Sequence, residues 1–155
     1  MIKIYVRAIV PTVNAYVLMG EPDKSGEIMW DLPGGALEAG QDVKQLLQKL
    51  VLKNTGYAIT DLKFFEIVCK VQPRTRAQDP VTTLDFIFTS TIDSAAAQQQ
   101  PTKDIELLPF DHFEWLDSGK RFKLNKVMNL LSRYHSKTAA THDKRLNVDV
   151  EPNVV

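Results

Sequence analysis

The chain has little cysteine, no excess charge of either sign and no long apolar run, and each shortage excludes a class of protein. Its one cysteine, Cys69, excludes an internal disulfide and a cysteine-based zinc site. The apolar run "FFEIVCK" around it favours a buried, inert thiol. Lys plus Arg and Asp plus Glu both number 19, so the net charge of zero gives no overall field to attract nucleic acid or an anionic membrane. No segment approaches the roughly 20 apolar residues that span a bilayer.

What remains is an ordinary globular composition. A chain of 155 residues with 44% hydrophobic residues suits one domain with a real core. The N-terminal "MIKIYVRAIVPT" interleaves charged and apolar residues, unlike a signal peptide. We therefore expect a cytoplasmic protein with a single domain at residues 1–136. The segment "KTAATHDKRLNVDVEPNVV" lacks helical periodicity, which predicts a C-terminal tail at 137–155.

Period-2 alternation and β-branched residues predict several strands, at 3–10, 14–20, 28–32, 60–72, 81–91 and 113–117. The strongest helix is predicted at 42–54, where apolar residues follow the i, i+3, i+4, i+7, i+8 spacing: Val43, Leu46, Leu47, Leu50 and Val51. A second amphipathic helix is predicted at 123–136, and 93–104 is a low-complexity connector. Strands around one early and one late helix predict an α/β fold with a mixed sheet between helices.

The ends of the first helix carry capping residues. Asp42 with Gln45 three residues later resembles a capping box, and Gly56 suits a C-terminal cap. Both residues support the predicted helix boundaries.

The segment before this helix, "WDLPGGALEAG", suits an anionic ligand. A predicted strand ends at Pro33, and two glycines, Gly34 and Gly35, let the backbone approach a ligand closely. The helix that follows directs N–H groups and its positive dipole end toward anions. A phosphate is the ligand that this arrangement predicts.

Here the sequence resembles the Nudix (MutT-like) hydrolase superfamily. Its box reads G, five residues, E, seven residues, then R-E-U-x-E-E-x-G-U, where U is apolar. Alignment on Gly35 and Gly56 gives the full 23-residue box without a gap, and Val51 and Tyr57 match its apolar positions. Glu38 and Gly40 match the common opening. The strand order extends the resemblance over residues 1 to 135 and implies a Nudix-like α/β/α sandwich.

The departures from the box concern its metal-binding acids. The resemblance implies three carboxylates on one helix face that hold Mg²⁺ or Mn²⁺, which neutralises a diphosphate and activates water. Those positions are Leu50, Lys53 and Asn54 here, and the box's first Glu and its Arg are Gln41 and Lys49. All four box glutamates are therefore absent. We expect no metal by the usual ligand set and no cofactor.

Other residues offer a partial replacement. Glu38, the acid retained in the motif, is the one catalytic candidate, while Asp42 is better explained as a helix cap. We expect four further acids to be solvated or salt-bridged on the surface: Glu66, Asp85, Asp104 and Glu106. Candidate phosphate ligands, besides Gly34 and Gly35, are Lys53, which would act as a point charge, and Arg74 and Arg76 on a hairpin-like loop. Arg7 is also a candidate phosphate ligand, and it either lines the cleft or pairs with an acid such as Glu38.

Histidines and tryptophans give no further site. His112, His135 and His142 are scattered without ligand spacing, so we expect structural or surface roles. Trp30 and Trp115 are expected in the core or the cleft wall.

Three functions stay open. The first is a Nudix-fold protein that binds a nucleotide or nucleoside-diphosphate compound without efficient hydrolysis. The second is an active pyrophosphohydrolase with substitute carboxylates, the one case in which Mg²⁺ or Mn²⁺ would be needed. The third is a protein-interaction scaffold. Nudix proteins often dimerise, so a homodimer is compatible with the resemblance.

Overall fold

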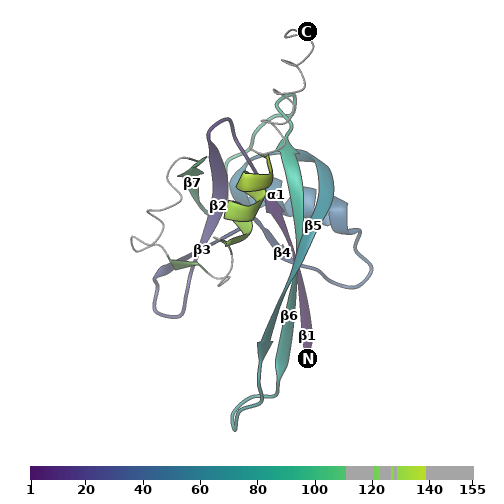
Figure 1. Cartoon of the computed structure of the whole chain (residues 1–155), viewed down its shortest axis with the longest axis vertical. Coiled ribbons are helices and arrows are strands. Elements are labelled where there is room, and N and C mark those ends of the chain that lie inside the picture. The colour runs from purple at the N-terminus through teal and green to yellow at the C-terminus, as the bar shows by residue number, and fades with distance from the viewer. Residues whose placement is uncertain (111–120, 123–126, 128, 139–155) are drawn as a thin grey trace, which may run out of the picture.

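The computed structural model of the protein describes residues 1–110, 121–122, 127 and 129–138 (Figure 1). These residues contain the helix α1 (Val43–Thr55) and further helical residues at 127 and 129–138. The strands are β1 (Ile2–Ile9), β2 (Ala15–Pro22), β3 (Ile28–Asp31), β4 (Gly34–Ala36), β5 (Ile59–Gln72), β6 (Val81–Ile92), β7 (Asp104–Pro109) and β8 (Arg121–Phe122). None of the described helices is long and apolar enough to cross a membrane.

The strands form two four-stranded sheets. The first sheet has the order β4-β1-β6-β5 and the second β7-β2-β3-β8. Each sheet is mixed, because β1 pairs with β6 and β3 pairs with β8 in parallel while the other pairs are antiparallel. The predicted α/β class is confirmed, with two sheets in place of the single mixed sheet.

Helices cover the sheets from two sides. One apolar cluster joins Leu47 and Val51 of α1 to Val6 and Ala8 of β1. The other joins the helical residues Val127, Leu130 and Leu131 to strand residues such as Ile9, Ile87 and Leu108. Because neighbouring residues of a strand face opposite sides, Ala8 and Ile9 direct β1 into both clusters. The fold is thus an α/β/α sandwich.

Local sequence explains α1. The Asp42 carboxylate accepts a hydrogen bond from the Gln45 N–H at 2.9 Å, and Gly56 closes the helix in the left-handed region at φ 82°. A side chain at Gly56 would meet the carbonyl oxygen of Gln99 at 2.2 Å. Both predicted caps are confirmed, and the helix extends from 43 to 55 where 42 to 54 was predicted.

The sequence did not predict several of the strands, and some predicted features lie outside the described residues. The predictions omitted β4, β7 and β8, which are short or pair with strands distant in sequence. The predicted strand at 113–117, with His112 and Trp115, lies outside the described residues. So do His142 and the tail from residue 139, whereas residues 137 and 138 are still helical. Cys69 was predicted to be buried, and this was wrong: it is exposed.

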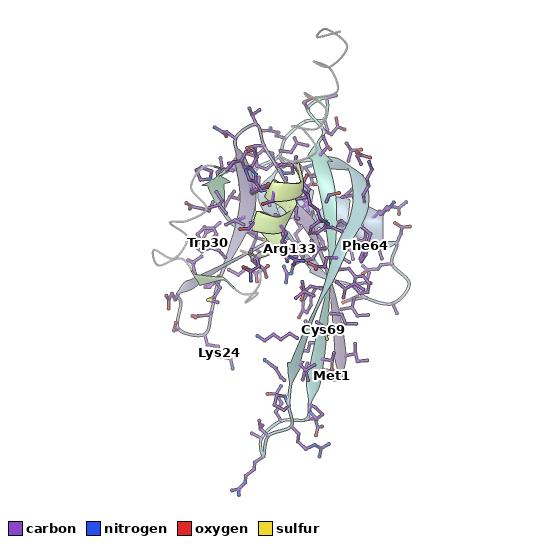
Figure 2. The ribbon with its side chains drawn as sticks, viewed as in Figure 1. Met1, Lys24, Trp30, Phe64, Cys69 and Arg133 are labelled. Atoms are coloured by element: carbon purple, nitrogen blue, oxygen red, sulfur yellow. The ribbon has the colours of Figure 1, made fainter. Side chains whose placement is uncertain are left out.

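The exposure of Cys69 follows from the length of β5 and β6. These strands, with the N-terminal half of β1, extend the first sheet well beyond α1, and Cys69 and Met1 lie on this extension (Figures 1 and 2). None of the described helices lies above this apolar run, so alternation does not bury both of its faces.

The second half of the sandwich is closed by aromatic and polar contacts. Tyr16 is buried, and its hydroxyl lies 3.2 Å from Nδ1 of His135. The pKa of Tyr16 is raised, mainly because burial removes water from the hydroxyl and also because Tyr134 lies nearby. His135 is therefore structural, as expected. Arg133 donates two hydrogen bonds of 2.6 Å to Glu66, which confirms the expected salt bridge of that acid.

Candidate functional site

The glycine loop joins β3 to α1 and is held tightly against β1. Gly34 pairs with Arg7, and its φ of 154° and its contacts exclude a side chain, since a Cβ there would lie 2.0 Å from the Val6 carbonyl oxygen. The Pro33 carbonyl accepts from the Ala8 N–H at 2.9 Å. The loop is therefore positioned by β1 as much as by the helix it precedes.

Leu50 occupies the helix position at which the Nudix box has the first of its three metal-binding acids. It is half-buried and packs against the apolar cluster under α1. Its Cδ1 would lie 3.1 Å from a Cβ built on Gly35. This side chain fills the space between α1 and the loop with hydrocarbon and offers no ligand for a cation.

The third of these positions is Asn54. Its side chain is buried, with 6% of the residue exposed, and Nδ2 donates to the Gly34 carbonyl oxygen at 3.2 Å. The sequence identified Asn54 only as a departure from the box, and it gave no sign of this bond. Between the two positions, Lys53 is exposed, and its carbonyl oxygen accepts bonds from the Thr102 N–H and hydroxyl.

The remaining box positions are on the surface. Gln41, which the resemblance aligns with the first box glutamate, accepts from the Glu38 N–H through Oε1 at 2.9 Å, and this bond closes the turn after the loop. Glu38 itself is exposed. Gln41 and Lys49 share an open hollow with Gly40, Asp42, Gln45 and Leu46. This hollow contains the first turn of α1 but does not include Gly34 or Lys53.

Arg7 belongs to a buried ion cluster. Its Nε donates to Asp85 at 2.8 Å, and its Nη2 lies 3.2 Å from an oxygen of Asp31. Its Nη1 donates to the Leu32 carbonyl oxygen at 3.1 Å. All three charged residues are at least 94% buried. Arg7 thus pairs with acids, as one of its two predicted roles, but Glu38 is not among them.

Asp85 corrects a prediction. It was expected at the surface, yet it is 1% exposed, because β6 lies between β1 and β5 in the first sheet. Asp31 was not a candidate at all. The segment "WDLPGG" contained it, but the register that aligns Tyr5 with Asp85 across parallel strands is not visible in sequence.

This cluster forms the floor of a cavity of about 220 Å³. The lining residues come from one face of β1, β5 and β6 and from β3: Lys3, Tyr5, Arg7, Asp31, Lys70, Gln72, Val81, Thr83 and Asp85. Lys3 and Lys70 add two ammonium groups to this lining, and the Arg7 guanidinium lies 5.3 Å from the centre of the Tyr5 ring. A polar cavity with three cationic and two acidic residues suits a ligand that carries both phosphate and hydrogen-bonding groups.

The two loop arginines are not part of either hollow. Arg74 and Arg76 are exposed in the turn between β5 and β6, at the far end of the extension from α1 (Figure 1). Arg74 lies 3.7 Å from Asp79. Of the other expected surface acids, Asp104 is exposed and Glu106 is half-buried, and Trp30 packs against the core.

A divalent cation does not fit the residues at the helix positions. Mg²⁺ prefers oxygen ligands, and these positions offer a leucine methyl group, an ammonium and an amide that already donates to Gly34. Within the described residues, no group of three or more His, Cys, Asp and Glu side chains is arranged to hold a metal ion.

Comparison with solved structures decides the fold. A NUDIX hydrolase from Nitrosomonas europaea superposes with a TM-score of 0.66 at 21% identity, over 88% of this chain and 90% of that one. The chain has the Nudix fold. An ADP compounds hydrolase superposes with a TM-score of 0.62 at 11% identity, over 88% of this chain and 74% of that one. A UDP-X diphosphatase superposes with a TM-score of 0.58 at 18% identity, over 89% of this chain and 64% of that one.

At these identities the likeness is one of fold. No protein-family model matches the Nudix-fold chain, and no curated protein matches its sequence. The loop, the helix and the cavity therefore have to be interpreted from their own chemistry.

Proposed function

We propose that this Nudix-fold protein binds a nucleotide or nucleoside-diphosphate compound without efficient metal-dependent hydrolysis. The observation that carries the proposal is the side-chain chemistry of the last turns of α1. Leu50 packs, Lys53 is a cation and Asn54 is a donor engaged with Gly34, so that none of the three supplies a carboxylate. Loss of a single supporting partner of a metal ligand already costs about 10- to 100-fold, and the loss of three direct ligands costs more.

Ligand binding is supported by the glycine loop, the cavity and the fold. The fold's solved relatives include proteins named for ADP compounds and for UDP-linked diphosphates. In this chain the ammonium groups of Lys3 and Lys70 are suited to a phosphate, and Tyr5 offers an aromatic ring on the same lining. Lys53 adds a cation at the end of α1, where it would replace part of the charge of a metal.

The experiment combines binding with turnover. ADP, UDP, ADP-ribose and UDP-glucose are titrated calorimetrically into the protein in excess EDTA, and phosphate or nucleotide release is then assayed with Mg²⁺ and with Mn²⁺. We expect binding of at least one compound in EDTA and turnover no higher than the blank. Metal-dependent turnover well above the blank would instead favour the hydrolase with substitute carboxylates, for which Asp31 and Asp85, two buried acids of the cavity lining, are candidates.

A protein-interaction role is favoured by one observation. The face of the first sheet opposite the cavity is apolar and exposed beyond α1, with Ile2, Phe64, Ile67 and Val71 between 47% and 68% exposed. The register places Ile2 and Val71 on either side of Thr82. A second copy of the chain would cover such a face as a homodimer. Light scattering tests this alternative, and a monomer that binds none of the four compounds would contradict both functions.

A further inference from the structure

The corner between the end of α1 and the glycine loop is closed by a single side-chain hydrogen bond. Asn54 Nδ2 donates to the Gly34 carbonyl oxygen at 3.2 Å, and both residues are buried. The Nudix box that the sequence resembles has an acid at the position of Asn54, one of the three that hold a divalent cation. This bond therefore lies where the fold's usual chemistry would place a carboxylate next to the loop.

The chemistry of the two groups makes the bond and a cation alternatives. The Gly34 carbonyl can only accept, and an ionised carboxylate at position 54 could also only accept. Two buried acceptors that face each other stay unsatisfied unless a cation or a proton lies between them. An amide removes this requirement because it supplies the hydrogen itself.

The helix side of the corner is fixed independently of Asn54's side chain. The Lys103 N–H donates to the Asn54 carbonyl, and the Thr102 N–H and hydroxyl donate to that of Lys53. The Gln99 N–H donates to the Gly56 carbonyl at 3.1 Å. Residues 99–103 hold the end of α1 in place through these hydrogen bonds. The bond from Asn54 to Gly34 therefore ties the glycine loop to a helix end that is itself anchored.

We infer that the Asn54 side-chain amide braces the glycine loop in place of a cation, so that the loop keeps its position without metal. Leu50 supports the brace from within, since it packs beside Gly35. The role needs no ligand and no catalysis. It holds whether or not nucleotides bind, and its test is separate from that of the proposed function.

The test measures thermal unfolding of the whole chain. For the wild type, we expect the same Tm in excess EDTA, in Mg²⁺ and in Mn²⁺. Asn54→Asp keeps the shape but loses the donor at neutral pH, and we expect its Tm to fall by about 4 to 10 °C. On acidification the new carboxyl gains a proton that it donates to Gly34, so the deficit relative to the wild type shrinks.

Gln48→Glu is a matched control on the same helix. Gln48 Nε2 also donates to a backbone carbonyl, that of Ile59 at 3.2 Å, but its residue is exposed. A carboxylate there can turn to water, so we expect a Tm loss of under about 2 °C. A wild type stabilised by Mn²⁺ and destabilised by EDTA would overturn the inference. So would an Asn54→Asp protein as stable as the wild type at neutral pH, or a deficit unchanged by protonation.

Discussion

Arg7 and Asp85 form a buried ion pair, Nε to Oδ1 at 2.8 Å, between the parallel strands β1 and β6. The pair joins the floor of the cavity to the glycine loop, because the same guanidinium also donates to the Leu32 carbonyl and contacts Asp31. The Arg7 side chain thus contacts both the buried acids of the cavity and the start of the glycine loop.

Removal of this guanidinium should be costly. Arg7→Met leaves two buried carboxylates without their cation, and we predict a loss of about 3 to 5 kcal/mol in the free energy of unfolding, measured by urea denaturation. The control is Arg74→Met, which breaks the exposed Arg74–Asp79 contact and should change stability by less than about 0.5 kcal/mol. Equal losses in the two variants would contradict a structural role for the cluster.

The ammonium groups of the cavity should determine phosphate affinity. The double variant Lys3→Gln/Lys70→Gln is predicted to bind ADP about tenfold or more weakly, which corresponds to at least ~1.4 kcal/mol. Arg76→Gln removes an exposed cation outside the cavity and is the charge control. Calorimetry in low salt measures both. If Arg76→Gln weakens ADP as much as the double variant does, general charge and not the cavity attracts the ligand.

Lys53 is tested in the same way. If its ammonium replaces part of a metal's charge, Lys53→Glu weakens ADP binding, and Lys44→Glu, another exposed lysine of α1, leaves it unchanged. An ADP affinity that does not change in Lys53→Glu would remove Lys53 from the site and leave the glycine loop and the cavity as the proposed phosphate-binding regions.

How far the sequence predicted this site depends on the residue. The helix caps were predictable because they are local: Asp42 accepts from the Gln45 N–H, and the Gly56 N–H donates to the Leu52 carbonyl. The sequence alone also shows that the positions aligned with the box acids hold no carboxylate. The partners of Arg7 were not predictable, since Asp85 is 78 residues away and becomes its neighbour only through the pairing of β1 with β6.

Asn54 and Cys69 show the same limit. Asn54 was recognised only as a departure from the box, because its bond to Gly34 depends on how closely the loop approaches the helix. Cys69 was placed in the core because its neighbours are apolar, but none of the helices that the structure describes covers β5 at that point. Long-range packing decided both residues.

Gly56 offers a clean test of the helix end. Gly56→Ala meets the Gln99 carbonyl oxygen and also strains a φ of 82°, whereas Gly40→Ala at φ 84° has no heavy atom within 4 Å. We predict about 1 kcal/mol of destabilisation for Gly40→Ala and at least ~2 kcal/mol for Gly56→Ala. Urea denaturation measures the loss of stability in each variant. Since both variants strain a positive φ and only Gly56→Ala adds a contact, the difference between the two losses gives the cost of the contact. Similar losses in the two variants would show that residues 99–103 do not press on the helix end.

Leu50 and Gly35 should be coupled. A methyl group at position 35 would approach Leu50 Cδ1 to 3.1 Å, so Gly35→Ala is expected to destabilise the wild type more than it destabilises Leu50→Ala. A double-mutant cycle should give an interaction free energy of at least ~0.5 kcal/mol. Additive losses would mean that Leu50 does not pack against the loop.

The central claim is that the site binds a nucleoside diphosphate without metal. Its most direct test is one calorimetric comparison, the titration of ADP into the wild-type protein in excess EDTA and again in Mn²⁺. The proposal predicts ADP binding in EDTA with a Kd within about threefold of that in Mn²⁺, a difference under ~0.7 kcal/mol. Binding that occurs only with Mn²⁺ would contradict it, because a cation would then be part of the site.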